Sequence, residues 1–206
     1  MSNKKVLILF TSSELGGAEK SLTRLASTIK NRIDIYLATM DGKGPWIKFC
    51  NQNNITPITL GRRKEKLKHG SINFENLFKL TLLLYKEKYD IVYGVGMRIS
   101  FILRFLTLFS NKTKFINAVR WHPASSKIED KFFRVVEKYF SFLVDFYICN
   151  SEISKSLLIE KCKVKEKKIN VIYNGIQNSN FLLKNNNKVP ILLITANLSP
   201  RKGIDK

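Results

Sequence analysis

Histidine and cysteine are both scarce in this sequence. The 206 residues include two histidines, His69 and His122, so a metal site built from several histidines is excluded by number. The three cysteines, Cys50, Cys149 and Cys162, form no C-x-x-C pair and leave one thiol over in any pairing. This pattern supports neither a disulfide framework nor a zinc site, and it fits a reducing cytoplasm. We therefore expect no metal ion.

A long uninterrupted hydrophobic run is also missing. The most apolar helical pattern, residues 97–109, is broken by Arg98 and Arg104 and falls short of the ~20 residues that a membrane-spanning helix needs. The N-terminus leads from Met1 almost directly into a strand pattern, without the apolar segment and cleavage site of a signal peptide. These features predict a cytoplasmic protein, and the surplus of positive charge adds peripheral contact with the inner face of the cell membrane as an expectation.

Acidic residues are few. Sixteen Asp and Glu stand against 36 Lys and Arg, which gives a formal net charge of +20. Such a surplus favours anionic partners, namely nucleic acid, an acidic membrane surface or a phosphorylated substrate. The charge alone does not choose among them, and a general lysine bias explains it equally well. Because no motif of interleaved aromatic and basic residues is present, a basic nucleic-acid-binding module is a weaker alternative, and we expect no nucleic-acid partner.

One cluster of positive charge is local. Between Gly61 and His69, a predicted loop carries five cations. A solvated loop is the common explanation of such a run. The functional alternative is contact with an anionic membrane, because each basic residue near such a surface contributes about 1 kcal/mol. The predicted membrane-contact residues are Arg62, Arg63, Lys64, Lys66 and Lys68.

What the sequence does contain is a regular alternation of short β-rich runs and longer helical patterns. This order predicts βαβ units and hence an α/β fold, with a Rossmann-like parallel sheet and helices on both faces. The predicted strands are residues 4–11, 33–39, 55–60, 90–95, 113–119, 145–149, 169–173 and 189–196. The predicted helices are residues 17–31, 44–53, 72–88, 97–110, 127–143 and 151–162.

The helix predicted over residues 127–143 carries an apolar stripe at helical spacing. We interpret the stripe as part of the core rather than as a cofactor site. Its members are Phe132, Val136, Tyr139, Phe140 and Leu143.

A domain boundary is predicted after the seventh strand. Asn174-Gly175 is a turn dipeptide at a strand end, and residues 184–188 form a polar low-complexity stretch. The resulting division is a first domain over residues 1–175, a linker over 176–188 and the start of a second Rossmann-like domain over 189–206.

Gly16-Gly17-Ala18-Glu19 follows the first strand and opens the first helix. Free backbone N–H groups and the helix dipole point at whatever docks on such a helix start, which makes it a potential anion site. The missing Cβ atoms let a bulky ligand approach the backbone, and Glu19 in the first turn favours the helix start. The alternative is a helix that begins here and binds nothing.

Three further positions follow strands. His122 comes after the fifth strand, at the carboxyl edge where ligands of open α/β sheets bind, and Pro123 keeps it out of a helix. A ligand contact and a loop histidine bonded to the backbone explain it equally well. Asn150-Ser151 ends the sixth strand, where helix capping is the default role. Gly94-x-Gly96 has no third glycine at position 99, so we interpret it as a tight strand-to-helix turn.

A nicotinamide-dependent Rossmann enzyme is another function class to consider. Asp41 follows the second strand at about the right distance from the glycine loop to bind a ribose. Gly16-Gly17 lacks the G-x-G-x-x-G spacing, however, so this alternative ranks below the following one.

Four segments, taken in order, resemble one family: the retaining glycosyltransferases of the two-domain GT-B fold, also called the group 1 or family-four class. Each segment is common individually, and their order and spacing make the resemblance specific. It implies an amino-terminal domain that holds a glycan acceptor and a carboxyl-terminal domain that holds a nucleotide sugar. The segments are Gly16-Gly17-Ala18-Glu19, Asn150-Ser151, Asn174-Gly175-Ile176 and Leu198-Ser199-Pro200-Arg201-Lys202-Gly203-Ile204-Asp205.

The resemblance also implies roles for individual residues. His122 would be the catalytic residue beside the transferred sugar, and Lys202 would neutralise the departing diphosphate. No cofactor or metal is then needed, because N–H donors and ammonium groups stabilise the leaving group. The substrates would be a nucleotide sugar and a lipid-linked or cell-surface glycan. The donor-binding set is Gly16, Gly17, Arg201 and Lys202, and the acceptor or cleft set is Glu19, Arg120, Asn150 and Ser151.

Two departures from the family pattern matter. Where the family has Gly-Arg before its Lys-Gly, this sequence has Ala196-Asn197, so one donor cation is missing unless Arg201 replaces it. The second-domain Glu-x(7)-Glu motif, which holds the donor in this family, is not present in residues 189–206, which contain no glutamate. We therefore expect a truncated second domain and no transfer activity from this chain alone.

Overall fold

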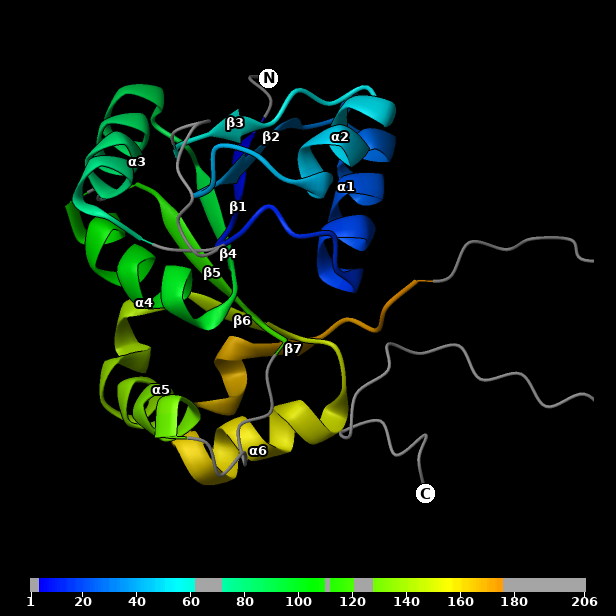
Figure 1. The fold of residues 1–206 in the computed structure, drawn as a ribbon. Helices are drawn as coiled ribbons and strands as arrows, with labels where there is room; N and C mark the ends of the chain where they lie inside the picture. The colour runs from blue at the N-terminus through cyan, green and yellow to red at the C-terminus, as the bar shows by residue number, and fades with distance from the viewer. Residues whose placement is uncertain (1–3, 62–71, 110–111, 121–127, 176–206) are drawn as a thin grey trace, which may run out of the picture. The chain divides into compact units, whose positions relative to one another are not determined.

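A seven-stranded parallel sheet is the centre of the structure (Figure 1). The computed structural model describes residues 4–61, 72–109, 112–120 and 128–175. Within them the strand order is β3-β2-β1-β4-β5-β6-β7. The strands are β1 (Lys5–Phe10), β2 (Asp34–Thr39), β3 (Ile58–Thr59), β4 (Ile91–Val95), β5 (Lys114–Val119), β6 (Phe146–Cys149) and β7 (Ile169–Val171).

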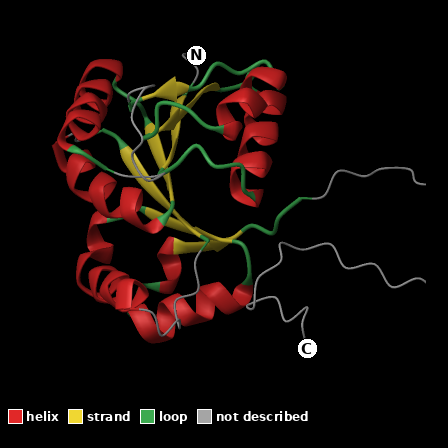
Figure 2. Cartoon of the chain, viewed as in Figure 1, coloured by secondary structure: helices red, strands yellow, loops and turns green. Residues whose placement is uncertain are grey.

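The described residues contain six α-helices and three short 3-10 helices (Figure 2). None of these helices is long and apolar enough to cross a membrane. The α-helices are α1 (Gly17–Ile29), α2 (Pro45–Gln52), α3 (Phe74–Glu87), α4 (Met97–Leu106), α5 (Ile128–Phe140) and α6 (Glu152–Cys162). The 3-10 helices are η1 (Thr107–Phe109), η2 (Ser141–Leu143) and η3 (Glu166–Lys168).

Helices cover both faces of the sheet, and each face has its own apolar cluster (Figure 1). On one face, Leu22 of α1 and Trp46 of α2 pack against strand residues that include Phe10. On the other face, Leu80 of α3 and Leu103 of α4 belong to the second cluster, as do buried residues of α6. Because consecutive residues of a strand point to opposite faces, central strands of such a sheet must be apolar throughout.

Strand β1 occupies the middle of the sheet and meets that requirement. Leu7 and Leu9 lie in one cluster, while Ile8 and Phe10 lie in the other. Its last residue, Phe10, is level with Thr39 of β2 and with Val95 of β4. The three strands therefore end together, and the loops that follow them leave the sheet at one place.

The predicted α/β fold class is confirmed, and the strands and helices predicted up to residue 175 are all present. The largest difference is β3, which is paired only over Ile58–Thr59 instead of residues 55–60. Pro57 precedes this edge strand, and proline cannot donate to a strand ladder. The predicted linker over 176–188, the second-domain start over 189–206 and its strand over 189–196 lie outside the described residues.

The interpretation of the apolar stripe on α5 is partly wrong. Val136 is buried as expected, but Phe132 and Tyr139 are mostly exposed, and the buried phenylalanine is Phe133. Apolar residues on α5 form two separate stripes, and periodicity alone does not say which of two stripes faces the sheet.

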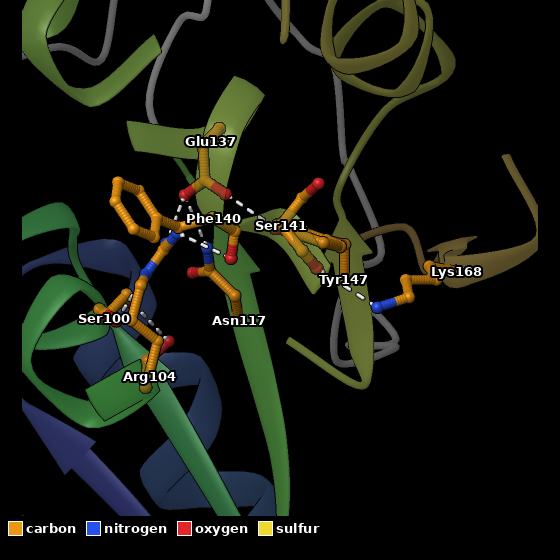
Figure 3. A network of polar contacts seen from close by, with 9 residues as sticks. Ser100, Arg104, Asn117, Glu137, Phe140, Ser141, Tyr147 and Lys168 are labelled. Atoms are coloured by element: carbon orange, nitrogen blue, oxygen red, sulfur yellow. Dashed lines mark hydrogen bonds and ion pairs between the residues drawn. The ribbon is translucent and has the colours of Figure 1, made fainter. Parts of the chain in front are cut away.

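A buried charge pair connects α5 to α4 (Figure 3). Arg104 Nη2 donates a hydrogen bond to Glu137 Oε1 at 2.7 Å, and both side chains are almost completely buried. Glu137 also accepts hydrogen bonds from Asn117 Nδ2 at 3.1 Å and from the Tyr147 hydroxyl at 2.6 Å. Burial and the neighbouring carboxylate raise the pKa of the Tyr147 phenol, so it remains a donor. One carboxylate thus holds together α4, α5, β5 and β6.

Lys168 holds the segment that follows the C-terminal end of α5 (Figure 3). Lys168 Nζ donates to the carbonyl oxygens of Ser141 at 3.1 Å, Phe142 at 3.3 Å and Val144 at 2.5 Å. These carbonyls lie in and just after η2, which directly follows α5. A cation near the C-terminal end of a helix interacts favourably with the carbonyl groups of the last turn.

Replacing Glu137 by glutamine should strongly destabilise the protein. The change keeps the size of the side chain but leaves the Arg104 guanidinium buried without its counter-ion, and breaking a buried pair in this way costs about 3–5 kcal/mol. We expect Glu137→Gln to lower the free energy of unfolding in urea by that amount.

The matched control is Lys114→Ala, which breaks the ion pair with Asp145. Lys114 is 64% exposed, and such pairs contribute less than about 1 kcal/mol. Equal stability of Glu137→Gln and the wild type would mean that the buried pair does not hold α5.

Candidate functional site

The loops after β1 and β4 leave the sheet toward opposite faces. The loop after β1 leads to α1 on one face, and Gly96 after β4 leads to α4 on the other. In open α/β sheets this reversal of strand order produces a crevice at the carboxyl ends of the two strands, and ligands bind there. The candidate site is therefore at the ends of β1 and β4.

Gly96 allows the two loops to approach each other. Its φ angle is +109°, which residues with a side chain rarely adopt. A Cβ atom at Gly96 would lie 2.8 Å from Thr11 Oγ1, which belongs to the loop after β1. A side chain at position 96 would thus be both strained and crowded. The interpretation of Gly94-x-Gly96 as a tight strand-to-helix turn is confirmed.

Ser13 anchors the loop after β1 to the loop after β2. It is fully buried, and its backbone N–H donates to Asp41 Oδ2 at 2.9 Å. Its hydroxyl donates to the same carboxylate oxygen at 3.3 Å and also contacts the Lys43 carbonyl. Its own carbonyl accepts a hydrogen bond from the Trp46 N–H at 3.0 Å. All polar groups of Ser13 therefore bond to residues 41–46, which comprise the loop after β2 and the first residues of α2.

Two glycines make room for this anchor. A Cβ atom at Gly44 would overlap the Ser13 side chain. A Cβ atom at Gly61 would lie 2.6 Å from both the Met40 carbonyl oxygen and the Gly42 nitrogen. The backbone segments after β1, β2 and β3 are therefore packed too closely for side chains at these positions.

Asp41 has a structural role in this arrangement. Its carboxylate accepts two hydrogen bonds from Ser13 and so fixes the loop that leads to the glycine pair. The sequence suggested Asp41 as a ribose ligand of a nicotinamide enzyme. The structure accounts for this aspartate without a ribose, which removes the main support for that alternative.

The start of α1 is open at Gly17. Gly16 is the N-cap residue, and no side chain caps the helix there. A Cβ atom at Gly16 would lie 2.6 Å from Glu19 Oε2, so the Glu19 carboxylate lies beside Gly16. A Cβ atom at Gly17, by contrast, would meet no atom of the described residues within 4 Å. The backbone N–H groups of a first helical turn have no partner within the helix, so Gly17 presents them beside open space.

Arg120 connects the ends of three strands. It follows β5, and its Nη1 donates to Asn174 Oδ1, after β7, at 3.3 Å. Burial raises the pKa of the Tyr93 phenol on β4, and the nearby Arg120 guanidinium partly opposes this rise. A cation is thus present at the carboxyl edge, on the side of β4 away from β1.

Asn150 and Ser151 lie at the same edge, after β6. The Ser151 hydroxyl oxygen accepts a hydrogen bond from the Ser154 N–H at 3.2 Å, so Ser151 caps α6. The default interpretation of this pair as a helix cap is therefore confirmed for Ser151. Asn150 is partly buried between β6 and α6.

Several predicted site residues lie outside the described residues. They are His122, Arg201, Lys202 and the basic loop of Arg62, Arg63, Lys64, Lys66 and Lys68, whose roles remain predictions. Among residues that the structure does describe, no group of three or more His, Cys, Asp or Glu side chains could hold a metal ion. Sequence analysis did not find Ser13, because its importance depends on Asp41, which is distant in the chain.

An open parallel sheet with a glycine-opened helix at its switch point is typical of Rossmann-like domains. The sequence of residues 15–179 matches the family described as Glycosyltransferase Family 4. The chain therefore belongs to glycosyltransferase family 4. Among curated proteins, none matches the sequence significantly.

Solved structures with the same fold include HepE from Anabaena, crystallised in complex with UDP. It is 17% identical, with a TM-score of 0.66 over 84% of this chain and 44% of its own. The lipopolysaccharide outer core galactosyltransferase WaaB, in its apo form, is 16% identical, with a TM-score of 0.60 over 85% of this chain and 47% of its own.

A UDP-GlcNAc 2-epimerase from Methanocaldococcus jannaschii is also similar. It is 17% identical, with a TM-score of 0.56 over 82% of this chain and 45% of its own. Such low identities establish the common fold alone, and that fold is shared by a galactosyltransferase and an epimerase. The chain spans less than half the length of these three proteins.

Alanine substitutions at two glycines should separate an open position from a packed one. Gly17→Ala should keep the free energy of unfolding or raise it by up to about 1 kcal/mol. The new Cβ atom would meet no atom of the described residues within 4 Å, and alanine restricts the unfolded chain. Gly96→Ala should lower it by about 1–3 kcal/mol, because a positive φ angle strains any side chain.

Thermal and urea unfolding of the two variants measure both effects. A Gly17→Ala variant that is less stable than the wild type would give Gly17 a structural role and remove it from the candidate site.

Proposed function

We propose that this chain is the acceptor-side domain of a retaining glycosyltransferase. The reaction moves a sugar from a nucleotide-sugar donor to a lipid-linked or cell-surface glycan during polysaccharide biosynthesis for the cell envelope. The observation that carries the proposal is the family match over residues 15–179, which includes the open helix start at Gly17. The protein would act in the cytoplasm, at the inner face of the cell membrane.

The chemistry needs a site that stabilises a leaving diphosphate. When the bond between the anomeric carbon and the phosphate oxygen breaks, negative charge develops on the phosphate. The backbone N–H groups at Gly16 and Gly17, together with the positive end of the α1 dipole, would stabilise that charge without moving. A side chain at position 17 would occupy the space that the donor requires.

The remaining roles follow the family pattern. Arg201 and Lys202 would neutralise the diphosphate from the second domain, and His122 would contact the transferred sugar. The acceptor oxygen would form its bond on the face from which the diphosphate leaves, which retains the anomeric configuration. Glu19, Arg120, Asn150 and Ser151 would line the acceptor side. No cofactor or metal ion takes part in this scheme.

The similar structures support the choice of substrates. HepE was crystallised with UDP, and WaaB is a galactosyltransferase of the lipopolysaccharide outer core. A nucleotide sugar is therefore a reasonable donor, and a surface glycan a reasonable acceptor. The epimerase shares the fold, so the fold by itself does not select transfer. The family match favours transfer over epimerisation.

The 206-residue chain should transfer no sugar on its own. Catalysis requires a donor held against an acceptor, and residues 189–206 provide only a predicted strand and the start of a helix for the donor side. We expect no product when the purified chain is incubated with nucleotide sugars and lipid-linked saccharides. Turnover by this chain would contradict the two-domain proposal.

Acceptor binding should nevertheless be measurable and should depend on Arg120. Its guanidinium lies at the carboxyl edge, where it can donate to an acceptor phosphate or hydroxyl. Arg120→Ala should weaken binding of a lipid-linked saccharide by about tenfold, which corresponds to one charge-assisted hydrogen bond.

Isothermal titration calorimetry with the same saccharide panel measures this effect. Lys114→Ala is the matched control, because it removes a cation from the opposite end of the same strand, β5. Equal affinities of the Arg120→Ala variant and the wild type would remove Arg120 from the acceptor site.

A further inference from the structure

Asn174-Gly175 is the only asparagine-glycine pair in the 206-residue sequence. Both residues are exposed, and they follow the last described strand, β7. The ladder between β6 and β7 ends with the bond from the Ile172 N–H to the Cys149 carbonyl at 2.8 Å. Figure 1 shows the segment after β7 leaving the sheet. Pairing with β6 therefore does not fix the backbone of Asn174.

An asparagine that precedes a glycine can lose its side-chain amide without an enzyme. The backbone nitrogen of the glycine gives up its proton and attacks the asparagine Cγ atom. The side-chain amide takes up a proton and leaves as ammonia, which closes a five-membered succinimide ring. Water then opens the ring to aspartate or to isoaspartate, in which the main chain runs through Cγ. Glycine favours the attack because no Cβ atom hinders its nitrogen.

The surroundings of Gly175 leave room for this attack. A Cβ atom at Gly175 would meet no atom of the described residues within 4 Å. At Gly44, Gly61 and Gly96, by contrast, a Cβ atom would lie less than 3 Å from another atom. The succinimide ring can therefore form at Gly175 without displacing the described part of the protein.

Arg120 contacts the atom on which negative charge develops in this reaction. Its Nη1 donates to Asn174 Oδ1 at 3.3 Å, although the two residues are 54 positions apart in the sequence. When the nitrogen attacks Cγ, an electron pair of the carbonyl bond moves onto Oδ1 and stays there until ammonia leaves. A positively charged donor at that oxygen stabilises the intermediate, as the donors of an oxyanion hole do.

We infer that Asn174 is a site of spontaneous conversion to aspartate and isoaspartate in the folded protein, and that the Arg120 guanidinium accelerates the conversion. Three observations support the inference together: the exposure of the pair, the open space at Gly175 and the hydrogen bond from Arg120. The inference goes beyond the proposed function, because the reaction needs water and neither a sugar nor a second domain.

Two comparable pairs in the chain are held by the fold. Asp41-Gly42 can close the same ring by losing water, but the Asp41 carboxylate accepts two hydrogen bonds from the buried Ser13. In Asn150-Ser151, Asn150 is partly buried, and the hydroxyl and carbonyl oxygens of Ser151 both accept hydrogen bonds from α6. We expect neither pair to react while the protein is folded.

The products change both the charge and the main chain at this position. Aspartate puts a carboxylate where an amide oxygen now accepts a hydrogen bond from Arg120, so an ion pair replaces a weaker contact. Isoaspartate also adds a methylene group to the main chain, directly before the end of the compact unit of residues 1–175. Either product would occupy the guanidinium that the proposed function assigns to the acceptor.

The test follows the mass of the peptide that contains residue 174. The full chain is incubated in an alkaline buffer and in a mildly acidic one, and proteolysis with tandem mass spectrometry locates each conversion of an amide to a carboxylate. Asn174 should convert, and it should convert faster in the alkaline buffer, because the attacking nitrogen must lose its proton. Asn150 should stay unchanged over the same period.

Three variants separate the contributions to the rate. Gly175→Ala should slow the conversion at least about tenfold, because a Cβ atom hinders the nitrogen. The fold tolerates this change, since Gly175 lacks the positive φ angle of Gly96. Arg120→Ala should slow it about fivefold, less than the loss of a buried oxyanion donor does, because solvent and salt screen this exposed contact. Lys114→Ala, at the other end of β5, is the matched control and should convert as the wild type does.

Unfolding the chain isolates the contribution of the folded structure. In concentrated urea the wild type and the Arg120→Ala variant should convert at equal rates, because only the fold brings the guanidinium to Asn174. Circular dichroism shows that each variant is folded in the absence of urea.

Three outcomes would overturn the inference. The first is an unchanged Asn174 in the folded wild type. The second is an equal rate for the folded wild type and the folded Arg120→Ala variant, since the conversion would then be that of any such dipeptide. The third is a difference between the two that persists in urea, since it would not come from the folded contact.

Discussion

The hydrogen bonds between Ser13 and Asp41 determine the geometry of the candidate site. They join the loop after β1 to the loop after β2, and Gly44 is a glycine because the Ser13 side chain occupies the space beside it. The loop that leads to the helix start is therefore held in place before any ligand arrives. A site of this kind does not pay the ordering cost of a mobile loop on binding.

Around this anchor, most glycines have other atoms close to the position of a Cβ atom. Thr11 approaches Gly96, the Glu19 carboxylate lies beside Gly16, and backbone atoms crowd Gly61. Gly17 is the exception, since a Cβ atom there would meet no atom of the described part of the chain within 4 Å. The absence of a side chain is explained by packing at Gly44, Gly61 and Gly96. At Gly17 no packing against the described residues explains it, and this is why we propose a ligand there.

Sequence patterns predicted the fold well and the site incompletely. The strands are apolar throughout because both faces of the sheet are covered, so their positions could be recognised from local composition. The orientation of α5 could not be recognised in this way. The helix has two apolar stripes, and the burial of Phe133 rather than Phe132 depends on neighbours in space. The role of Glu137 could not be recognised from the sequence either, because its partners come from three other elements. They are Arg104, Asn117 and Tyr147.

The sequence by itself determined the order of strands and helices, the glycine pair at the start of α1 and the family to which the chain belongs. These depend on short segments or on linear order, both of which are visible in one dimension. The tertiary structure decided that Asp41 holds Ser13, that Arg120 meets Asn174, and that α3 and α5 present apolar side chains outward. Such relations join residues that are far apart in the chain, and only the packing of the folded sheet brings them together or leaves them exposed.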